Sequence, residues 1–263
     1  MRLLDALFGP LRRVKRNYAL PSSLVPLLDL SYAALQRGDN NVARQLLLQV
    51  LEHRDDLQNP ALMVLVLSRL AATWFRSEQY RECAEFFSQY IADHPQDALG
   101  YSFRAGSLWY AGSRKDAVED YAKALEFDPK DSRALMGRGQ IFVEQGEFQK
   151  AVQDLDAALE NLEQLAVPDE NWRTAVRAFT LNGRAAAYSG LGEFDRAISE
   201  FEKSILLRPH NAWVYYNRAE AYERRGKIPE ALENYKLALT MKRPKLNATR
   251  RENAELKVKT LRA

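Results

Sequence analysis

A pattern of large and small residues recurs four times along this chain, with steps of 34, 46 and 34 residues between successive copies. Repeats of this length predict an array of supersecondary units, each of which buries its apolar face only by stacking on its neighbours. Each clear copy has a large residue, a small residue four positions later and a second large residue three positions after that. The four copies start at Tyr101, Leu135, Leu181 and Tyr215.

The small residue of each copy predicts a point where one helix approaches another closely. The large residue three positions later shares that helical face and fills the space beside it. A glycine then follows where the first helix must end, because glycine tolerates a left-handed backbone. The small residues are Ala105, Gly139, Ala185 and Ala219, and the turn glycines are Gly112, Gly146, Gly192 and Gly226. Pro129 and Pro209 separate a copy from the next.

Two weaker copies precede these four. The nearer one fits well but has Glu78 in place of the turn glycine, and the first, around Leu27 to Val50, fits loosely. The spacings between equivalent small residues are 40, 34, 34, 46 and 34, measured along Ala43, Cys83, Ala117, Ala151, Ala197 and Ala231. The chain therefore contains six predicted units.

This pattern resembles the tetratricopeptide repeat, a helix–turn–helix unit of 34 residues. The resemblance implies an all-α fold, a right-handed superhelical solenoid of antiparallel helix pairs with a C-terminal capping helix. We expect residues 21–241 to hold the six repeats, between a basic amphipathic segment, 1–20, and a basic capping helix, 242–263. The expected repeats are about 24–57, 64–97, 98–131, 132–167, 178–211 and 212–243.

The step of 46 residues contains twelve more residues than the regular period. Leu155, Leu159 and Leu162 keep helical spacing, and Pro168 with the acids after it favours the start of another helix. We expect two lengthened helices that meet near 167–168 in a hairpin around 160–177, with Trp172 closing its apolar seam. This hairpin is either a second contact surface or a tolerated insertion.

The sequence carries no recognisable catalytic or cofactor motif. Its three histidines are scattered, and the familiar zinc, redox and phosphate-cradle motifs are absent. The single cysteine, Cys83, stands where other copies carry alanine, so we expect a small buried residue and a reducing compartment. We therefore predict a protein that is not an enzyme and has no cofactor, metal site or catalytic residue.

Charge is divided unevenly along the chain. Residues 1–20 carry a net charge of +4 and residues 240–263 carry +6, whereas the array between them carries −7. In the expected capping helix, Leu246, Leu256 and Leu261 are predicted to cover the last repeat while the charged residues face water.

The N-terminal segment has three alternative roles. Its first sixteen residues place an apolar stripe before the basic residues Arg12, Arg13, Lys15 and Arg16. Such a segment binds an anionic membrane surface, contacts a partner or folds back onto its own repeats. The acidic array argues against an extended nucleic-acid footprint. We expect a cytoplasmic protein that is either free or peripherally attached to a membrane.

In the tetratricopeptide family, the first helices of successive repeats line a concave groove. Transferring these positions by spacing gives an unusually aromatic surface, and aromatic side chains provide contact area at low conformational cost. The alternative is that several of them pack against neighbouring helices. The candidate groove residues are Phe75, Arg76, Phe103, Trp109, Tyr110, Arg133, Met136, Gln140, Phe179, Asn182, Trp213, Tyr216, Asn217 and Glu220.

Two other binding modes receive less support from the sequence. Some family members hold a partner's C-terminal carboxylate with a fixed set of lysines, asparagines and an arginine, but the corresponding positions here include Ser102, Gly106 and Gly137. The arginines that precede the small residues recur in register, and we expect them to pair with acids on a neighbouring helix rather than to bind phosphate. They are Arg104, Arg138, Arg184 and Arg218.

These observations predict a non-catalytic scaffold that binds an extended or helical segment of another protein in an aromatic groove. One alternative is a peripheral membrane adaptor anchored by residues 1–16. Another is a regulatory subunit whose N-terminal segment occupies its own groove. Each alternative assigns a different role to the same basic segment.

Overall fold

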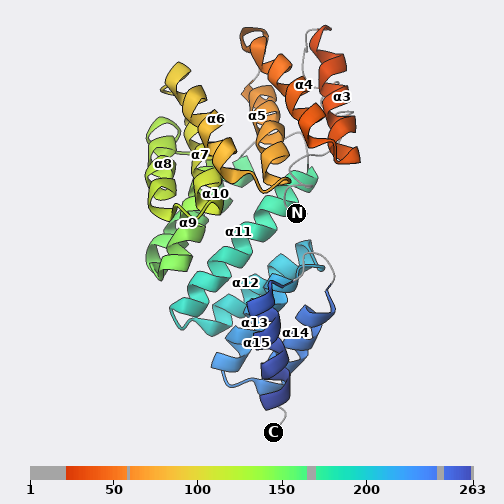
Figure 1. Ribbon diagram of the computed structural model, residues 1–263. Helices are drawn as coiled ribbons and strands as arrows, with labels where there is room; N and C mark the ends of the chain where they lie inside the picture. The colour runs from red at the N-terminus through yellow and green to blue at the C-terminus, as the bar shows by residue number, and fades with distance from the viewer. Residues whose placement is uncertain (1–21, 58–59, 165–169, 242–245, 262–263) are drawn as a thin grey trace. The chain divides into compact units, whose positions relative to one another are not determined.

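A computed structural model describes residues 22–57, 60–164, 170–241 and 246–261 (Figure 1). The regular structure in these ranges is helical throughout, with no strand. The elements are α3 (Leu24–Arg37), α4 (Asn40–Glu52), the short 3-10 helix η1 (Arg54–Asp56), α5 (Pro60–Phe75), α6 (Tyr80–Asp93), α7 (Ala98–Tyr110), α8 (Arg114–Phe127), α9 (Ser132–Gln145), α10 (Phe148–Gln164), α11 (Glu170–Gly190), α12 (Phe194–Leu207), α13 (Ala212–Arg224), α14 (Ile228–Thr240) and α15 (Ala248–Thr260).

The helices from α3 to α14 form consecutive pairs joined by turns of two to four residues. The predicted turn glycines all adopt a left-handed backbone, with φ between 77° and 92°. Glu78 adopts the same conformation, with φ of 56°, at the turn where the sequence lacks the glycine. The predicted fold class, all-α with antiparallel helix pairs and a final helix after them, is confirmed.

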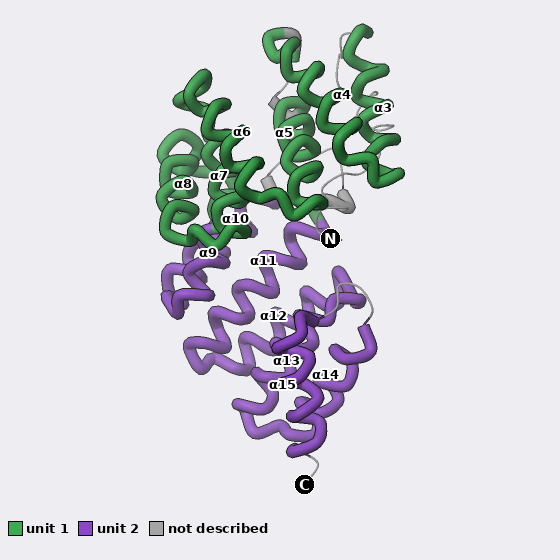
Figure 2. The backbone as a smooth tube through the Cα atoms, in the orientation of Figure 1, with its two compact units in different colours: residues 1, 3–137, 164–173 green, residues 2, 138–163, 174–263 purple. Residues whose placement is uncertain are grey.

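The chain divides into two compact units (Figure 2). The first unit comprises chiefly residues 3–137 and 164–173, and the second comprises chiefly 138–163 and 174–263. The division falls within α9, so the helix pairs from α3 to α8 belong to the first unit. The second unit holds the pair α13 and α14, helices α12 and α15, and most of α10 and α11.

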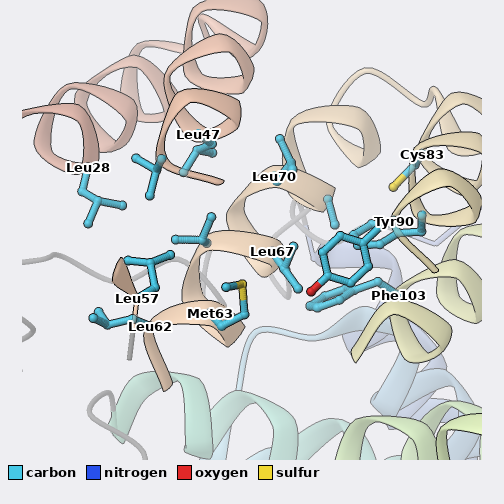
Figure 3. Packing of buried hydrophobic residues seen from close by; sticks show 14 of the residues in the cluster. Leu28, Leu47, Leu57, Leu62, Met63, Leu67, Leu70, Cys83, Tyr90 and Phe103 are labelled. Carbon is cyan, nitrogen blue, oxygen red and sulfur yellow. The ribbon is translucent and has the colours of Figure 1, made fainter. Parts of the chain in front are cut away.

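The core of the first unit is built from leucines and aromatic rings (Figure 3). Leu28, Leu47 and Leu67 are at most 1% exposed and belong to one cluster with Phe87. Cys83 lies in the same cluster and is fully buried, as its alanine-like position predicts. Burial raises the pKa of its thiol to about 12. This cysteine is therefore a packing residue.

The core of the second unit combines small residues with a few large rings. Phe201 and Tyr235 are fully buried against alanines of the neighbouring helices. Ala254 of α15, together with Leu246 before the helix and Leu261 after it, packs against α13 and α14. The expectation for Leu256 is wrong, because its side chain is 57% exposed. It lies two residues beyond Ala254 and therefore on the opposite side of the helix.

Glycines on the first helices permit close contact with bulky side chains. A Cβ atom at Gly137 would lie 2.2 Å from the ring of Tyr121, which occupies that space. A Cβ at Gly139 would lie 2.8 Å from Leu155. At Gly106, by contrast, the added atom would meet the Tyr121 hydroxyl at an ordinary 3.6 Å. The small positions of the pattern therefore correspond to real contacts between helices.

The recurring arginines pair with residues sixteen positions later, on the second helix of the same repeat. Arg104 binds Asp120 through two hydrogen bonds of 2.6 and 2.7 Å, and Arg138 binds Asp154 through two of 2.7 and 2.8 Å. Arg184 also donates two hydrogen bonds to Glu200, both to the same carboxylate oxygen. Arg218 meets an uncharged partner, donating to the Asn234 side-chain oxygen at 2.9 Å. The predicted pairing with an acid on a neighbouring helix is confirmed for Arg104, Arg138 and Arg184, whereas for Arg218 the partner is an amide.

Helices α10 and α11 contain 17 and 21 residues, whereas the helices of the last repeat contain 13 each. The predicted lengthening of both helices is therefore confirmed. The turn near 167–168 and the side chain of Trp172 lie outside the described residues. Arg177 of α11 forms an ion pair of 2.8 Å with Glu163 of α10.

Substituting two glycines beside the same tyrosine tests the close contact. Gly137→Ala is expected to lower the free energy of unfolding by about 1–3 kcal/mol, because the new methyl group overlaps the Tyr121 ring. Gly106→Ala is the matched control and is expected to raise stability by up to about 1 kcal/mol, because alanine favours the helix. Urea denaturation followed by circular dichroism measures both. Equal stability of the two variants would contradict this packing.

The Arg184–Glu200 pair predicts a pH dependence of stability. Burial of Glu200 raises its pKa, but hydrogen bonds from Lys203 and Arg184 outweigh burial and hold the pKa below its ordinary value of 4.5. The ionised carboxylate therefore stabilises the fold above that value, and this contribution is lost as the pH falls through the folded-state pKa.

Glu200→Gln is expected to destabilise the protein at about pH 7, with a difference from wild type that shrinks towards about pH 3. Urea denaturation at both pH values measures this difference. Glu119, whose side chain is 66% exposed in a pair with Lys115, provides the control. Glu119→Gln is expected to have little effect at either pH. A difference for Glu200→Gln that does not change with pH would contradict the prediction.

Candidate partner-binding surface

The first unit presents an aromatic group at the ends of three helices. Phe75 ends α5, Tyr80 begins α6 and Tyr110 ends α7. The rings of Tyr80 and Tyr110 are stacked with centroids 5.4 Å apart, and Phe75 meets both edge-on at 5.1–5.2 Å. Trp109 lies 5.2 Å from Tyr110. We call these four residues the aromatic rim.

Tyr110 is the most accessible member of the aromatic rim, with 51% of its surface exposed. The other three members are half-buried. Three neighbouring rings limit the movement of the Tyr110 side chain, so a partner would meet a preformed apolar surface that retains a polar hydroxyl.

The remaining candidates of the first unit are more enclosed. Phe103 is only 9% exposed and stacks on Phe87 at 5.2 Å. The Arg133 guanidinium lies 4.5 Å from the centre of the Phe103 ring. Arg76 donates a 2.6 Å hydrogen bond to the carbonyl of Leu35, and Met136 is half-buried. Phe103 therefore contributes mainly to the core, and Arg133 covers its outer face.

In the second unit, three candidates carry side-chain amides on three different first helices. Asn217 of α13 donates a 3.3 Å hydrogen bond to Asn182 of α11. Gln140 of α9 lies against the backbone of Gly183, where an added Cβ would be 1.9 Å from the Gln140 nitrogen. The three amide residues and Phe179 are half-buried. These side-chain amides therefore connect three successive first helices, α9, α11 and α13.

The last candidates lie under the final helix. The Arg250 guanidinium of α15 stacks on Trp213 at 4.3 Å and lies 5.5 Å from the ring of Tyr216. Tyr216 is only 4% exposed. Lys257 of α15 forms an ion pair with Glu223 of α13. These contacts place α15 against α13, the first helix of the sixth repeat.

Burial beneath α15 raises the pKa values of two side chains of α13. Burial raises the pKa of Tyr216 to about 12, with a further contribution from Glu220. Burial also raises the pKa of the Glu220 carboxyl, although Tyr216 and Arg250 act in the opposite direction. The hydrogen bond from Tyr216 and the charge of Arg250 therefore offset only part of the cost of burying this carboxylate.

Sequence reasoning missed Tyr80, because it considered only the first helix of each repeat. An aromatic residue also begins the second helix at Phe148 and Phe194. Each meets the end of the next first helix: Phe148 lies against Gly190, and Phe194 lies 4.9 Å from the Arg224 guanidinium. The recurrence of an aromatic residue at this position is the signal that would have identified Tyr80.

Two features of the described residues bear on other functions. Nowhere in them do three or more His, Cys, Asp or Glu side chains gather in a way that could hold a metal ion. None of the helices described is both long enough and apolar enough to cross a membrane. The basic segment of residues 1–20 lies outside the described part of the chain.

The comparisons with known proteins agree on the family. Tetratricopeptide-repeat models match residues 104–166 and 176–243. A TPR repeat-containing protein of Methanocaldococcus jannaschii is 24% identical over 62% of this chain and 28% of its own length. The Hsp70-Hsp90 organizing protein of Triticum aestivum is 31% identical over 38% of this chain and 17% of its own length. The chain thus spans less than a third of either relative.

Solved structures share the fold at low sequence identity. A chain of the APC/C hetero-tetramer Cut9-Hcn1 matches with a TM-score of 0.71 and 16% identity, over 99% of this chain and 46% of that one. PilW, a type IV pilus biogenesis factor, matches with a TM-score of 0.58 and 15% identity, over 75% of this chain and 97% of its own. Together with the paired helices, the left-handed turns and the two matching repeat models, these likenesses show that the chain belongs to the tetratricopeptide-repeat family.

Proposed function

We propose that this protein is a non-catalytic scaffold that binds a segment of another protein along the first helices of its repeats. The observation that carries this proposal is the aromatic rim, in which Tyr110 is half-exposed although three rings surround it. Ordered aromatic side chains at a surface supply contact area with little loss of conformational entropy. This surface suits an apolar or aromatic residue of a partner.

The relatives support a binding role at a general level. The wheat relative is named as an organizer of Hsp70 and Hsp90, and the structural neighbour with the TM-score of 0.71 comes from a hetero-tetramer. The groove positions of the first unit include Ser102, Gly106 and Gly137 and lack the lysines and asparagines of a carboxylate clamp. We therefore favour a ligand recognised along its length over one held by its terminal carboxylate.

Some candidate residues are too buried to contact a ligand directly. Phe103 and Tyr216 are almost fully buried and would act by shaping the surface. Trp109, Tyr110 and Phe179 retain more exposure on the first helices. The aromatic rim is consequently the best place to test the proposal.

Tyr110→Ser is expected to weaken partner binding by about 30-fold, which corresponds to about 2 kcal/mol for an aromatic hot spot. Phe127→Ser is the matched control, because Phe127 lies on the second helix α8 and is 42% exposed. A pull-down from native cell extract identifies the partner, and titration with that purified partner then measures affinity. Equal affinity of the two variants would remove the aromatic rim from the binding surface.

The membrane alternative depends on the basic residues near the N-terminus. If residues 1–16 anchor the protein, replacing Arg12, Arg13, Lys15 and Arg16 with serine is expected to abolish co-sedimentation with vesicles containing phosphatidylserine. Vesicles of phosphatidylcholine alone are the control. A full chain that stays in the supernatant with both kinds of vesicle would contradict the adaptor role.

A further inference from the structure

The last helix, α15, contacts α13 through two cationic side chains. The guanidinium of Arg250 lies 4.3 Å from the centre of the Trp213 ring, and Lys257 forms an ion pair of 2.5 Å with Glu223. Ala254 is the one residue of α15 that is fully buried. The helix therefore buries little apolar surface of its own, so the two cations contribute much of its attachment to α13.

These contacts follow the same spacing on both helices. Seven residues separate Arg250 from Lys257, and seven also separate Tyr216 from Glu223. The ring of Tyr216 lies 5.5 Å from the Arg250 guanidinium. Seven residues are about two helical turns, or about 10.5 Å along the axis. The two helices therefore run parallel here, and each cation of α15 faces its own group on α13.

The middle of this contact is imperfectly matched. Four residues after Arg250 and Tyr216, the shared spacing places Ala254 opposite Glu220. Burial raises the pKa of the Glu220 carboxyl, and the hydrogen bond from Tyr216 and the charge of Arg250 offset only part of this effect. Helix α15 thus presents a methyl group where a hydrogen-bond donor would stabilise the carboxylate.

Four residues of α13 beneath α15 share one side of that helix. Their spacing of three, four and three residues follows the helical period. We call them the acidic–aromatic stripe, and they are Trp213, Tyr216, Glu220 and Glu223. Aromatic faces attract cations, and two carboxylates on adjacent turns repel each other unless a cation lies close to them. The stripe therefore selects a basic ligand over a neutral or acidic one.

The spacing along the stripe also selects a helical ligand. Positions i, i+4 and i+7 lie on one side of a helix and span about 10.5 Å. An extended chain covers that distance in about three residues and points alternate side chains to opposite sides. A helix with a small residue between two cations fits the stripe, as α15 itself shows.

We propose that the acidic–aromatic stripe is a binding site for a basic helix of a partner protein, and that α15 occupies it as a competing internal ligand. The partner helix would carry a cation at position i, a small residue at i+4 and a second cation at i+7. This inference rests on the proposed scaffold function and adds a second site to it. A small residue with a hydroxyl group at i+4 would favour the partner over α15, because it would donate a hydrogen bond to Glu220.

A synthetic peptide with the sequence of residues 246–261, labelled with fluorescein, is the probe, and fluorescence anisotropy measures its affinity for the full chain. The full-length variant Arg250→Ala/Lys257→Ala weakens its own α15 as a competitor. The peptide is expected to bind this variant about tenfold more tightly than wild type. Full-length Arg251→Ala/Lys259→Ala is the matched control, because both cations are exposed, and is expected to behave as wild type. Circular dichroism confirms that each variant is folded.

Substitutions in the peptide test the spacing without altering the protein further. Against the Arg250→Ala/Lys257→Ala protein, the Arg250→Ser/Lys257→Ser peptide is expected to lose about tenfold or more in affinity. The Arg251→Ser/Lys259→Ser peptide has the same net charge and is expected to keep its affinity. An Ala254→Ser peptide is expected to bind about threefold more tightly, because serine donates a hydrogen bond to Glu220.

The outcomes separate this site from the aromatic rim. Loss of affinity in the Arg250→Ser/Lys257→Ser peptide alone would support the acidic–aromatic stripe, whereas equal affinity of the two double-serine peptides would overturn it. Equal affinity of the unmodified peptide for wild type and for the Arg250→Ala/Lys257→Ala protein would overturn the role of α15 as a competitor. Neither result affects the aromatic rim, which Tyr110→Ser tests separately.

Light scattering on the wild-type protein tests the other occupant of the stripe. A dimer that the Arg250→Ala/Lys257→Ala substitutions abolish would identify that occupant as α15 of a second copy. This result would overturn the assignment to a helix of a different protein. A wild-type monomer at the concentrations of the peptide titration would support the assignment.

Discussion

The fold depends on how closely neighbouring helices approach one another at small residues. Tyr121 fills the space that a Cβ atom at Gly137 would occupy, and Leu155 does the same at Gly139. The first contact joins neighbouring repeats and the second joins the two helices of one repeat, so close approach at small residues buries apolar area at both levels. The arginines add a second link, from Arg104 to Asp120 and from Arg138 to Asp154, with bidentate geometry that fixes the two helices of a repeat.

Most of the fold could be predicted because each repeat has the same spacing of small packing residues and turn residues. The turn positions were visible as glycines, and even Glu78 adopts the left-handed conformation that its place in the period demands. The final helix was less predictable. Leu256 is apolar but exposed, whereas Ala254 is buried. Apolar character alone could not identify the packing side of a helix with so few apolar residues.

The candidate surface was predictable in position but not in exposure. Spacing placed Phe103 and Tyr216 on groove-facing positions, yet both are buried. Their exposure depends on residues outside the pattern, such as Arg133 over Phe103 and Arg250 beside Tyr216. Tyr80 is the opposite case. It lies on a second helix, where no groove residue was predicted, and its ring nevertheless stacks on Tyr110 in the aromatic rim. The period thus fixes backbone positions, whereas side-chain accessibility depends on individual long residues.

The insertion before the fifth repeat shows how firmly the contact register is held. Arg104 also reaches Ser88, sixteen residues earlier, and Arg184 reaches Asp156, 28 residues earlier. The difference is twelve residues, the number by which the step of 46 exceeds the period of 34. The equivalent arginine therefore contacts the equivalent position of the preceding second helix, whether or not the insertion lies between the two residues. The extra residues lengthen α10 and α11 without displacing these contacts, so the register of the repeats does not depend on the length of these two helices.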